Sequence, residues 1–106
     1  MATYLWRVTY TSEGAKGLVS EGGTKRQAAV RQTVEKAGGK LIAFYFAIGE
    51  ADLYGIAEFP DTVTAAATSL AVNASGAVRL TSTQLLSPEE FDAATKMSIS
   101  YRAPGA

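Results

Sequence analysis

A chain of 106 residues has room for one domain, and 47% hydrophobic against 19% charged residues is the balance of a globular protein, not of a disordered one. The chain contains neither cysteine nor histidine, which excludes thiol catalysis, zinc sites of the Cys/His type and a Ser-His-Asp triad. Ten basic and ten acidic residues cancel, so no general electrostatic field attracts nucleic acid or an anionic membrane.

The first strand is predicted at residues 3–10, T-Y-L-W-R-V-T-Y, because this run is rich in aromatic and β-branched side chains. Residues 15–23 are harder to assign, since three glycines oppose a stable helix while Leu18 and Val19 favour burial. We expect a loop there that contains one short helical turn. The apolar face of the first strand consists of Tyr4, Trp6, Val8 and Tyr10.

The first long helix is predicted over residues 25–37. Thr24 is a suitable N-cap, and the two glycines at 38–39 end the helix. Apolar side chains recur at helical spacing, while the charged side chains lie mostly off that stripe. The stripe expected to face the core consists of Val30, Val34 and Ala37.

The most apolar part of the chain, residues 40–60, predicts a β-hairpin. Residues 41–48 carry no charged side chain and are mostly apolar on both alternating faces. The polar break G-E-A-D at 49–52 predicts a four-residue loop, and residues 53–59 form the returning strand. A strand that is apolar on both faces must be covered on both, and a chain of this length has only enough helix for one side.

The second half of the chain predicts helix, strand, helix and tail. Asp61 is the expected N-cap of the second helix, and a strand follows at residues 77–86. The run S-P-E-E at 87–90 is a capping box with proline at the first helical position, so a third helix is expected over 88–97 and a tail over 98–106. The side chains expected to be buried are Val63, Ala66, Ala67, Leu70 and Ala71 in the second helix, and Phe91, Ala94 and Met97 in the third.

The order βαββαβ with an extra C-terminal helix is that of an α+β, ferredoxin-like sandwich. Right-handed crossovers place the first two helices on one face of an antiparallel sheet and leave the other face open. That face carries more apolar surface than a monomer normally exposes, so we expect a dimer that packs face to face through its sheets. Alternatively, the third helix and the tail cover part of the face within one subunit. We place one domain at residues 1–97, and residues 98–106 form a tail that could dock on a neighbouring subunit.

Short motifs follow one another along most of the chain in a characteristic order. They are Y-T-S-E-G at 10–14, G-G-K at 38–40 leading into A-F-Y at 43–45, G-E-A-D at 49–52, A-E-F-P-D at 57–61, G-A-V-R at 76–79 and L-S-P-E-E at 86–90. Together they resemble the GYD-domain family over about residues 3 to 97. That family is named for Gly-x-Tyr-Asp in the hairpin loop, and here Ala51 stands at the tyrosine position. The resemblance implies a ferredoxin-like subunit of the dimeric α/β barrel kind and no particular reaction.

Polar side chains on the predicted strands are candidate ligand-binding residues, because a buried polar tip needs a partner. In a cleft between the helices and the sheet, or inside a dimer barrel, they could hold a small carboxylate or a planar aromatic ligand. Satisfied core contacts are the alternative, and we favour pairing of Glu58 with Arg7 or Arg79. We expect Gly49 and Asp52 to shape the loop, which calls for a positive φ and a side chain that bonds its own backbone. The candidates are Arg7, Tyr10, Tyr45, Tyr54, Glu58 and Arg79.

The expected function is assembly or small-ligand binding by a homo-oligomeric protein without a cofactor or a metal. Its expected partners are other copies of itself and a small molecule, with no nucleic acid and no membrane. The N-terminus lacks a signal sequence and no apolar run approaches a membrane span, so we expect a cytoplasmic protein.

A cofactor-independent enzyme is the alternative, an oxygenase or isomerase that acts on a small organic substrate in the barrel. Asp52 and Glu58 are then the candidate general bases. A pocket above about 300 Å³ that contains either carboxylate, out of reach of any arginine, would favour this alternative.

Overall fold

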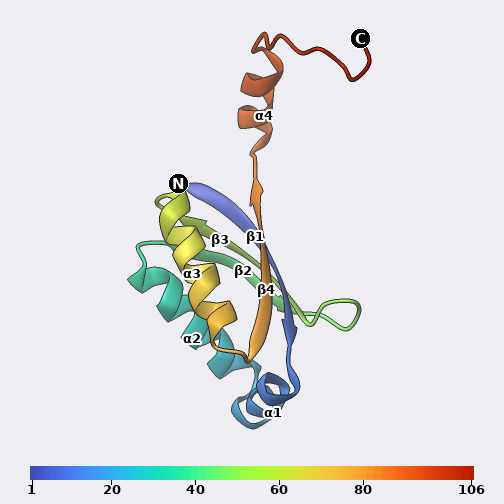
Figure 1. Ribbon diagram of the computed structural model, residues 1–106. Helices are drawn as coiled ribbons and strands as arrows, with labels where there is room; N and C mark the ends of the chain where they lie inside the picture. Colours follow the sequence, from blue (N-terminus) through green and yellow to red (C-terminus); the bar gives the residue numbers. More distant parts are fainter.

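The computed structural model describes all 106 residues and contains one antiparallel sheet with the strand order β2-β3-β1-β4. Figure 1 shows α2 and α3 on one face of this sheet, which confirms the predicted α+β, ferredoxin-like fold. The strands are β1 (Ala2–Tyr10), β2 (Lys40–Phe46), β3 (Leu53–Phe59) and β4 (Val78–Leu85). The helices are α1 (Ser12–Glu21), α2 (Gly23–Lys36), α3 (Thr62–Ala74) and α4 (Pro88–Thr95).

The hydrophobic core lies between the sheet and the helices. The aromatic ring of Phe59 is completely buried, and its centroid lies 6.1 Å from that of Tyr4 and 6.0 Å from that of Trp6. Alternate residues of β1 and β3 face this layer, as the period of two requires. The predicted apolar face of the first strand is thereby confirmed. The core consists of Tyr4, Trp6, Val8, Val34, Leu41, Leu53, Ala57, Phe59 and Ala65.

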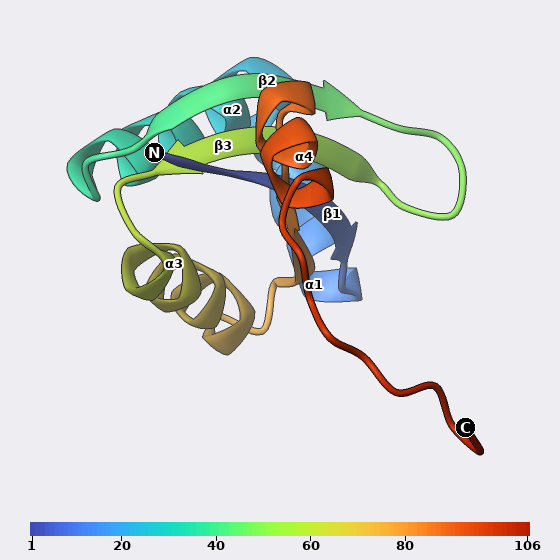
Figure 2. The same ribbon diagram turned by 90° about the horizontal axis from the view of Figure 1, so that it is seen from above.

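A β-bulge in β2 overturns the strict alternation expected for residues 41–48. Leu41 pairs with Ala57, but Ala43 rather than Ile42 pairs with Ile56, so one extra residue is inserted. Leu41 and Phe44 therefore both contact the core, although they would lie on opposite faces of a regular strand. The Ala47 amide then donates to the Asp52 carbonyl at 2.8 Å, and the four residues between them form the loop, one position earlier than expected. This loop projects beyond the sheet (Figure 2).

Helix α1 replaces the expected loop with one helical turn. The Thr11 side chain accepts a hydrogen bond from the Gly14 amide and caps a helix of ten residues. A side chain at Gly14 would overlap the Ala77 carbonyl, so glycine here permits a close helix–strand contact rather than breaking the helix. The next helix, α2, begins at Gly23 with Gly22 as its N-cap, and the expected cap at Thr24 is wrong. The predicted burial of Val34 is confirmed.

Helix α3 is capped as predicted but turns a different side to the core. The Asp61 carboxylate accepts a hydrogen bond from the Thr64 amide at 2.7 Å. The helix buries Ala65 and Thr68, while the expected core residues Val63 and Leu70 are exposed. Burial of Thr68 costs little because its hydroxyl donates to the Thr64 carbonyl at 2.9 Å. The expected stripe on α3 is therefore wrong, and it forms an exposed apolar surface.

Helix α4 carries the predicted capping box, in which Ser87 and Glu90 exchange hydrogen bonds. None of its residues is buried, and Met97 is exposed as well, so the expected burial of Phe91, Ala94 and Met97 is wrong. Figure 1 shows the reason: β4 leads straight out of the sheet and holds α4 beyond its end. Residues 86–106 are named the C-terminal arm below.

The face of the sheet opposite the helices, named the open face below, is covered by no element of the subunit. The register places Tyr45, Tyr54 and Arg7 side by side across β2, β3 and β1. The side chain of Tyr45 is 73% exposed and that of Tyr54 is 39% exposed. The alternative in which α4 and the tail cover this face within one subunit is therefore wrong.

Candidate functional site

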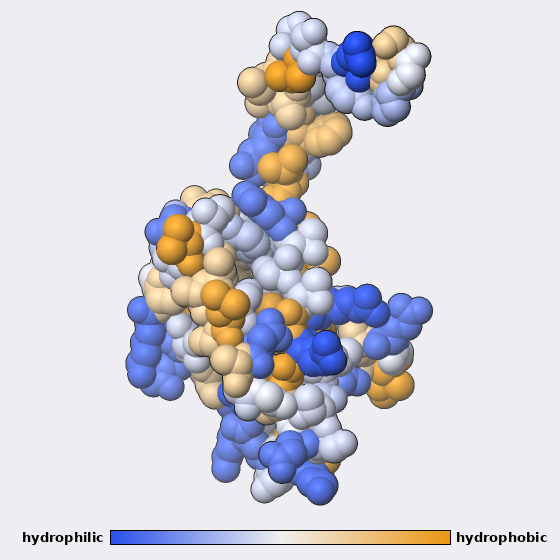
Figure 3. Space-filling model, in the orientation of Figure 1, coloured by the Kyte–Doolittle hydropathy of each residue, from blue (hydrophilic) through white to orange (hydrophobic).

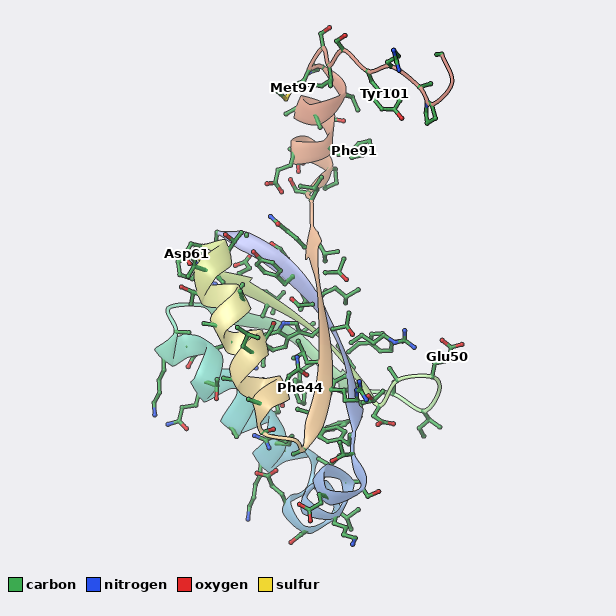
Figure 4. The ribbon with its side chains drawn as sticks, in the orientation of Figure 1. Phe44, Glu50, Asp61, Phe91, Met97 and Tyr101 are labelled. Atoms are coloured by element: carbon green, nitrogen blue, oxygen red, sulfur yellow. The ribbon has the colours of Figure 1, made fainter.

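A cavity of about 580 Å³ lies between the sheet and the helices α1, α2 and α3. The side chains that α2 and α3 turn toward it are short, among them Val30, Thr33 and Thr68, so they leave part of the sheet uncovered. Phe44 lies within this layer (Figure 4). The apolar lining consists of Trp6, Val8, Leu18, Val30, Phe44, Leu53, Val72, Ala77 and Val78.

The lining also includes a cluster of polar side chains from the end of β1, from α1 and from α2. Arg26 of α2 forms an ion pair with Glu21 of α1, with 3.6 Å between Nη1 and Oε2. The Nε–H group of Arg26 is buried and has no hydrogen-bond partner. Buried N–H groups in proteins are almost always paired, so this unpaired group, in a residue that lines the cavity, is an exception.

Tyr10 belongs to this cluster. Burial raises the pKa of the Tyr10 phenol; the charge of Arg26 lowers it, and the charges of Asp52 and Glu21 raise it further. The net shift is upward, so the phenol is neutral at pH 7 and available as a hydrogen-bond donor.

Trp6 adds a further donor to the lining. Only 3% of this residue is exposed, and its indole N–H is buried without a partner. The cavity therefore has a mostly apolar wall, and two of the residues that line it, Trp6 and Arg26, have a buried N–H group without a partner. Such a lining is suited to a mostly apolar molecule that carries a carbonyl or carboxylate oxygen.

The structure divides the six predicted site residues between the two faces of the sheet. Only Tyr10 lines the cavity. The other five are on the open face, because residues at odd positions of β1 and their cross-strand partners point away from the helices. Arg7, Tyr45 and Tyr54 form one row there, and Arg79 is a diagonal neighbour of Arg7. The five residues on the open face are Arg7, Tyr45, Tyr54, Glu58 and Arg79.

The expected pairing of Glu58 with an arginine is wrong. Strand register places Glu58 opposite Thr3 and Lys40, away from Arg7 and Arg79. Arg7 instead forms an ion pair with Glu50 in the loop, with 3.3 Å between Nη2 and Oε2. Glu50 lies at the far end of the projecting loop (Figure 4).

The loop residues have structural roles. The Asp52 carboxylate accepts a hydrogen bond from the Tyr10 amide at 2.8 Å, and the Asp52 amide donates to the Val8 carbonyl at 2.9 Å. Asp52 thus ties the loop to the end of β1. A positive φ at Gly49 was expected and is wrong, since the positive-φ glycines lie elsewhere. Ala51, at the position of the family's tyrosine, is completely buried.

Reasoning from the sequence missed the part of the cavity contributed by α1. Because no helix was expected at residues 12–21, there was no reason to place Glu21 close to Arg26. A signal was present: Thr11 followed three residues later by Gly14, with Glu13 in the first turn, is compatible with a capped helix. The glycines in this stretch outweighed that signal.

No three carboxylates lie close enough together to hold a metal ion. None of the four helices combines the length and the apolar character that crossing a bilayer requires.

Fold and cavity together define a ferredoxin-like α+β domain with a ligand-sized cavity between its sheet and its helices. The chain belongs to the GYD-domain family, because the family model described as GYD domain matches residues 4–95. The resemblance carried by the short motifs is thereby confirmed. No curated protein and no solved structure matches the chain.

Proposed function

We propose that this protein is a homo-oligomeric small-ligand-binding protein whose ligand occupies the cavity between the sheet and the helices. The supporting observation is the cavity itself: its volume of about 580 Å³ falls within the usual range for small-molecule sites. Its lining is mostly apolar, with a few polar groups, as such sites require.

The lining indicates the chemistry of the ligand. The unpaired N–H groups of Trp6 and Arg26 and the neutral phenol of Tyr10 can all donate hydrogen bonds. Glu13 and Glu21 also line the cavity and oppose a second negative charge. We therefore expect a small, largely apolar molecule with one anionic or carbonyl group.

Calorimetric titration with 4-phenylbutyrate and with 4-phenylbutan-1-ol tests this proposal, because the two probes share an apolar body and differ in the carboxylate. We expect the carboxylate to bind more tightly. Arg26→Met should weaken its binding about tenfold or more, the size of a lost charge-assisted hydrogen bond. The same substitution should change the affinity of the alcohol much less.

Two substitutions on α3 locate the binding site. Val72→Phe replaces an isopropyl group of the cavity lining with a larger phenyl ring and should abolish binding of both probes. Leu70→Phe, on the exposed side of the same helix, should leave binding unchanged. Equal loss of binding in both variants, or none in either, would contradict the proposed site.

Self-association through the open face is the second part of the proposal. Tyr45, Tyr54 and Ile42 expose much of their surface, and Leu5 and Ile56 are half-buried between the charged side chains of this face. Monomeric proteins rarely leave such an apolar surface uncovered. Packing of two copies through their open faces supplies the cover and corresponds to a dimeric α/β barrel.

No observation favours the enzyme alternative. The cavity exceeds about 300 Å³, but neither Asp52 nor Glu58 lines it, and Glu21 is paired with Arg26. The proposal therefore extends to binding and assembly and not to catalysis.

A further inference from the structure

The C-terminal arm, residues 86–106, makes no hydrogen bond and no ion pair with the rest of its own subunit. Figure 4 shows Phe91, Met97 and Tyr101 spread along the arm, well away from the sheet and from helices α1, α2 and α3. The large apolar side chains of the arm are all more than half exposed. They are Leu86 at 57%, Phe91 at 59%, Met97 at 68%, Ile99 at 75% and Tyr101 at 76%.

An arm of this kind needs a surface to pack against. Helix α4 has eight residues, and isolated helices shorter than about 12–15 residues are marginal in water. Its capping box satisfies the backbone at the start of the helix but buries no apolar side chain. Because its own sheet ends before α4 begins, the packing surface must belong to another molecule (Figure 1).

Two exposed surfaces of a second copy are available, and charge distinguishes them. The outer side of α3 is apolar, but α3 contains no charged residue. The open face combines apolar side chains with Arg7 and Arg79, which are diagonal neighbours on β1 and β4. Helix α4 carries Glu89, Glu90 and Asp92. The space-filling view shows hydrophobic and hydrophilic surface side by side on the arm (Figure 3).

We propose that the arm of one copy packs on the open face of a second copy, with the acidic side of α4 near Arg7 and Arg79. A two-fold axis perpendicular to β4 brings the end of one β4, with its arm, to the start of the other, where Arg79 lies. Each copy then gives and receives one arm. In the ion pair of Arg7 with Glu50 the two side chains are 49% and 90% exposed, so the pair is weak and easily exchanged for the new contact. This inference rests on the proposed self-association and names the element that completes it.

Charge reversal in two separate full-length variants tests the exchange. One variant carries Glu89→Lys and Asp92→Lys in the arm, and leaves Glu90 in its capping box. The other carries Arg7→Glu and Arg79→Glu on the open face. Alone, each variant brings like charges together in its own dimer, so the dissociation constant from concentration-dependent light scattering should rise about tenfold or more.

Mixing the two variants supplies the decisive comparison. In the mixed dimer both arms meet an open face of opposite charge, so the mixture should dimerise about tenfold or more tightly than either variant alone. If mixing the variants does not restore tight dimerisation, the exchange is overturned, because an arm that packs on its own chain does not respond to the charges of the partner. Circular dichroism of each variant verifies that the subunit fold is intact.

A chain that ends at Leu85 separates this inference from the proposed self-association. We expect this chain to be monomeric at concentrations at which the full chain is a dimer. A shortened chain that dimerises as tightly as the full chain would overturn the arm exchange and leave association through the open faces standing. A full-length chain that stays monomeric at every concentration would overturn both.

Discussion

At the scale of single residues, alternation along β1 decides which side chains can act together. Tyr10 and Trp6 face the cavity, whereas Arg7, between them in sequence, belongs to the open face. The six candidates chosen from the sequence were polar residues on strands, and their positions along those strands assign them to two separate surfaces. The pairing of Arg26 with Glu21 in the cavity lining was not predicted, because it depends on α1, and the glycines of that segment argued against a helix.

Tyr10 predicts a change of stability at high pH. In the unfolded chain its phenol loses a proton near the ordinary pKa of 10.0, while in the folded protein the raised pKa keeps it protonated to higher pH. Above pH 10 the unfolded state therefore binds fewer protons, and stability falls as pH rises through the folded pKa. Urea unfolding between pH 8 and pH 11 should show a steeper fall for the wild type than for Tyr10→Phe.

Tyr45→Phe is the matched control for this effect, because Tyr45 is 73% exposed on the open face. Its pH profile should follow that of the wild type. If Tyr10→Phe and the wild type lose stability in parallel above pH 10, the phenol of Tyr10 is not held in its neutral form.

At the scale of elements, features that depend on neighbouring residues could be predicted from the sequence, whereas features that depend on the packing of whole elements could not. The capping residues Asp61 and Ser87 and the apolar face of β1 were identified from sequence because each depends on a few neighbouring residues. The bulge at Ile42 and the buried side of α3 depend on how well whole elements fit together. Alanine and threonine on several sides of α3 leave its orientation to tertiary contacts.

Alanine substitutions at two glycines of α1 are expected to change the free energy of unfolding in opposite directions. A β-carbon at Gly14 would overlap the Ala77 carbonyl, which also accepts hydrogen bonds from the amide and hydroxyl of Thr11. Gly14→Ala should therefore lower the free energy of unfolding by about 1–3 kcal/mol, the usual cost of overpacking. Nothing lies within 4 Å of a β-carbon at Gly17, so Gly17→Ala should raise it by about 0.5–1 kcal/mol.

Chemical denaturation of both variants measures these changes. The pair also tests whether α1 exists as a helix, since its ten residues include Gly14, Gly17 and the cavity residues Leu18 and Glu21. Stabilisation by both substitutions, or destabilisation by both, would contradict the packing of α1 on Ala77.

At the scale of the whole molecule, the two faces of the sheet differ in what covers them. The face under the helices forms the core and the cavity, whereas the open face and the C-terminal arm carry the exposed apolar side chains on which the proposed self-association rests. An apolar strand covered on both sides could be inferred from residues 41–48, and this is why self-association was expected from the sequence. The cavity could not be inferred, because it depends on short side chains that meet only in the folded subunit.

The central claim is that a small ligand enters this cavity, and the indole N–H resonance of Trp6 tests it most directly. Trp6 is the only tryptophan, so a ¹⁵N–¹H correlation spectrum contains a single indole signal, and that N–H has no partner in the free protein. On titration with 4-phenylbutyrate this signal should move as the indole acquires a new acceptor or neighbour, while the side-chain Nε–H signal of Arg7 on the open face stays in place. An unchanged indole signal, with shifts confined to the open face, would contradict the claim.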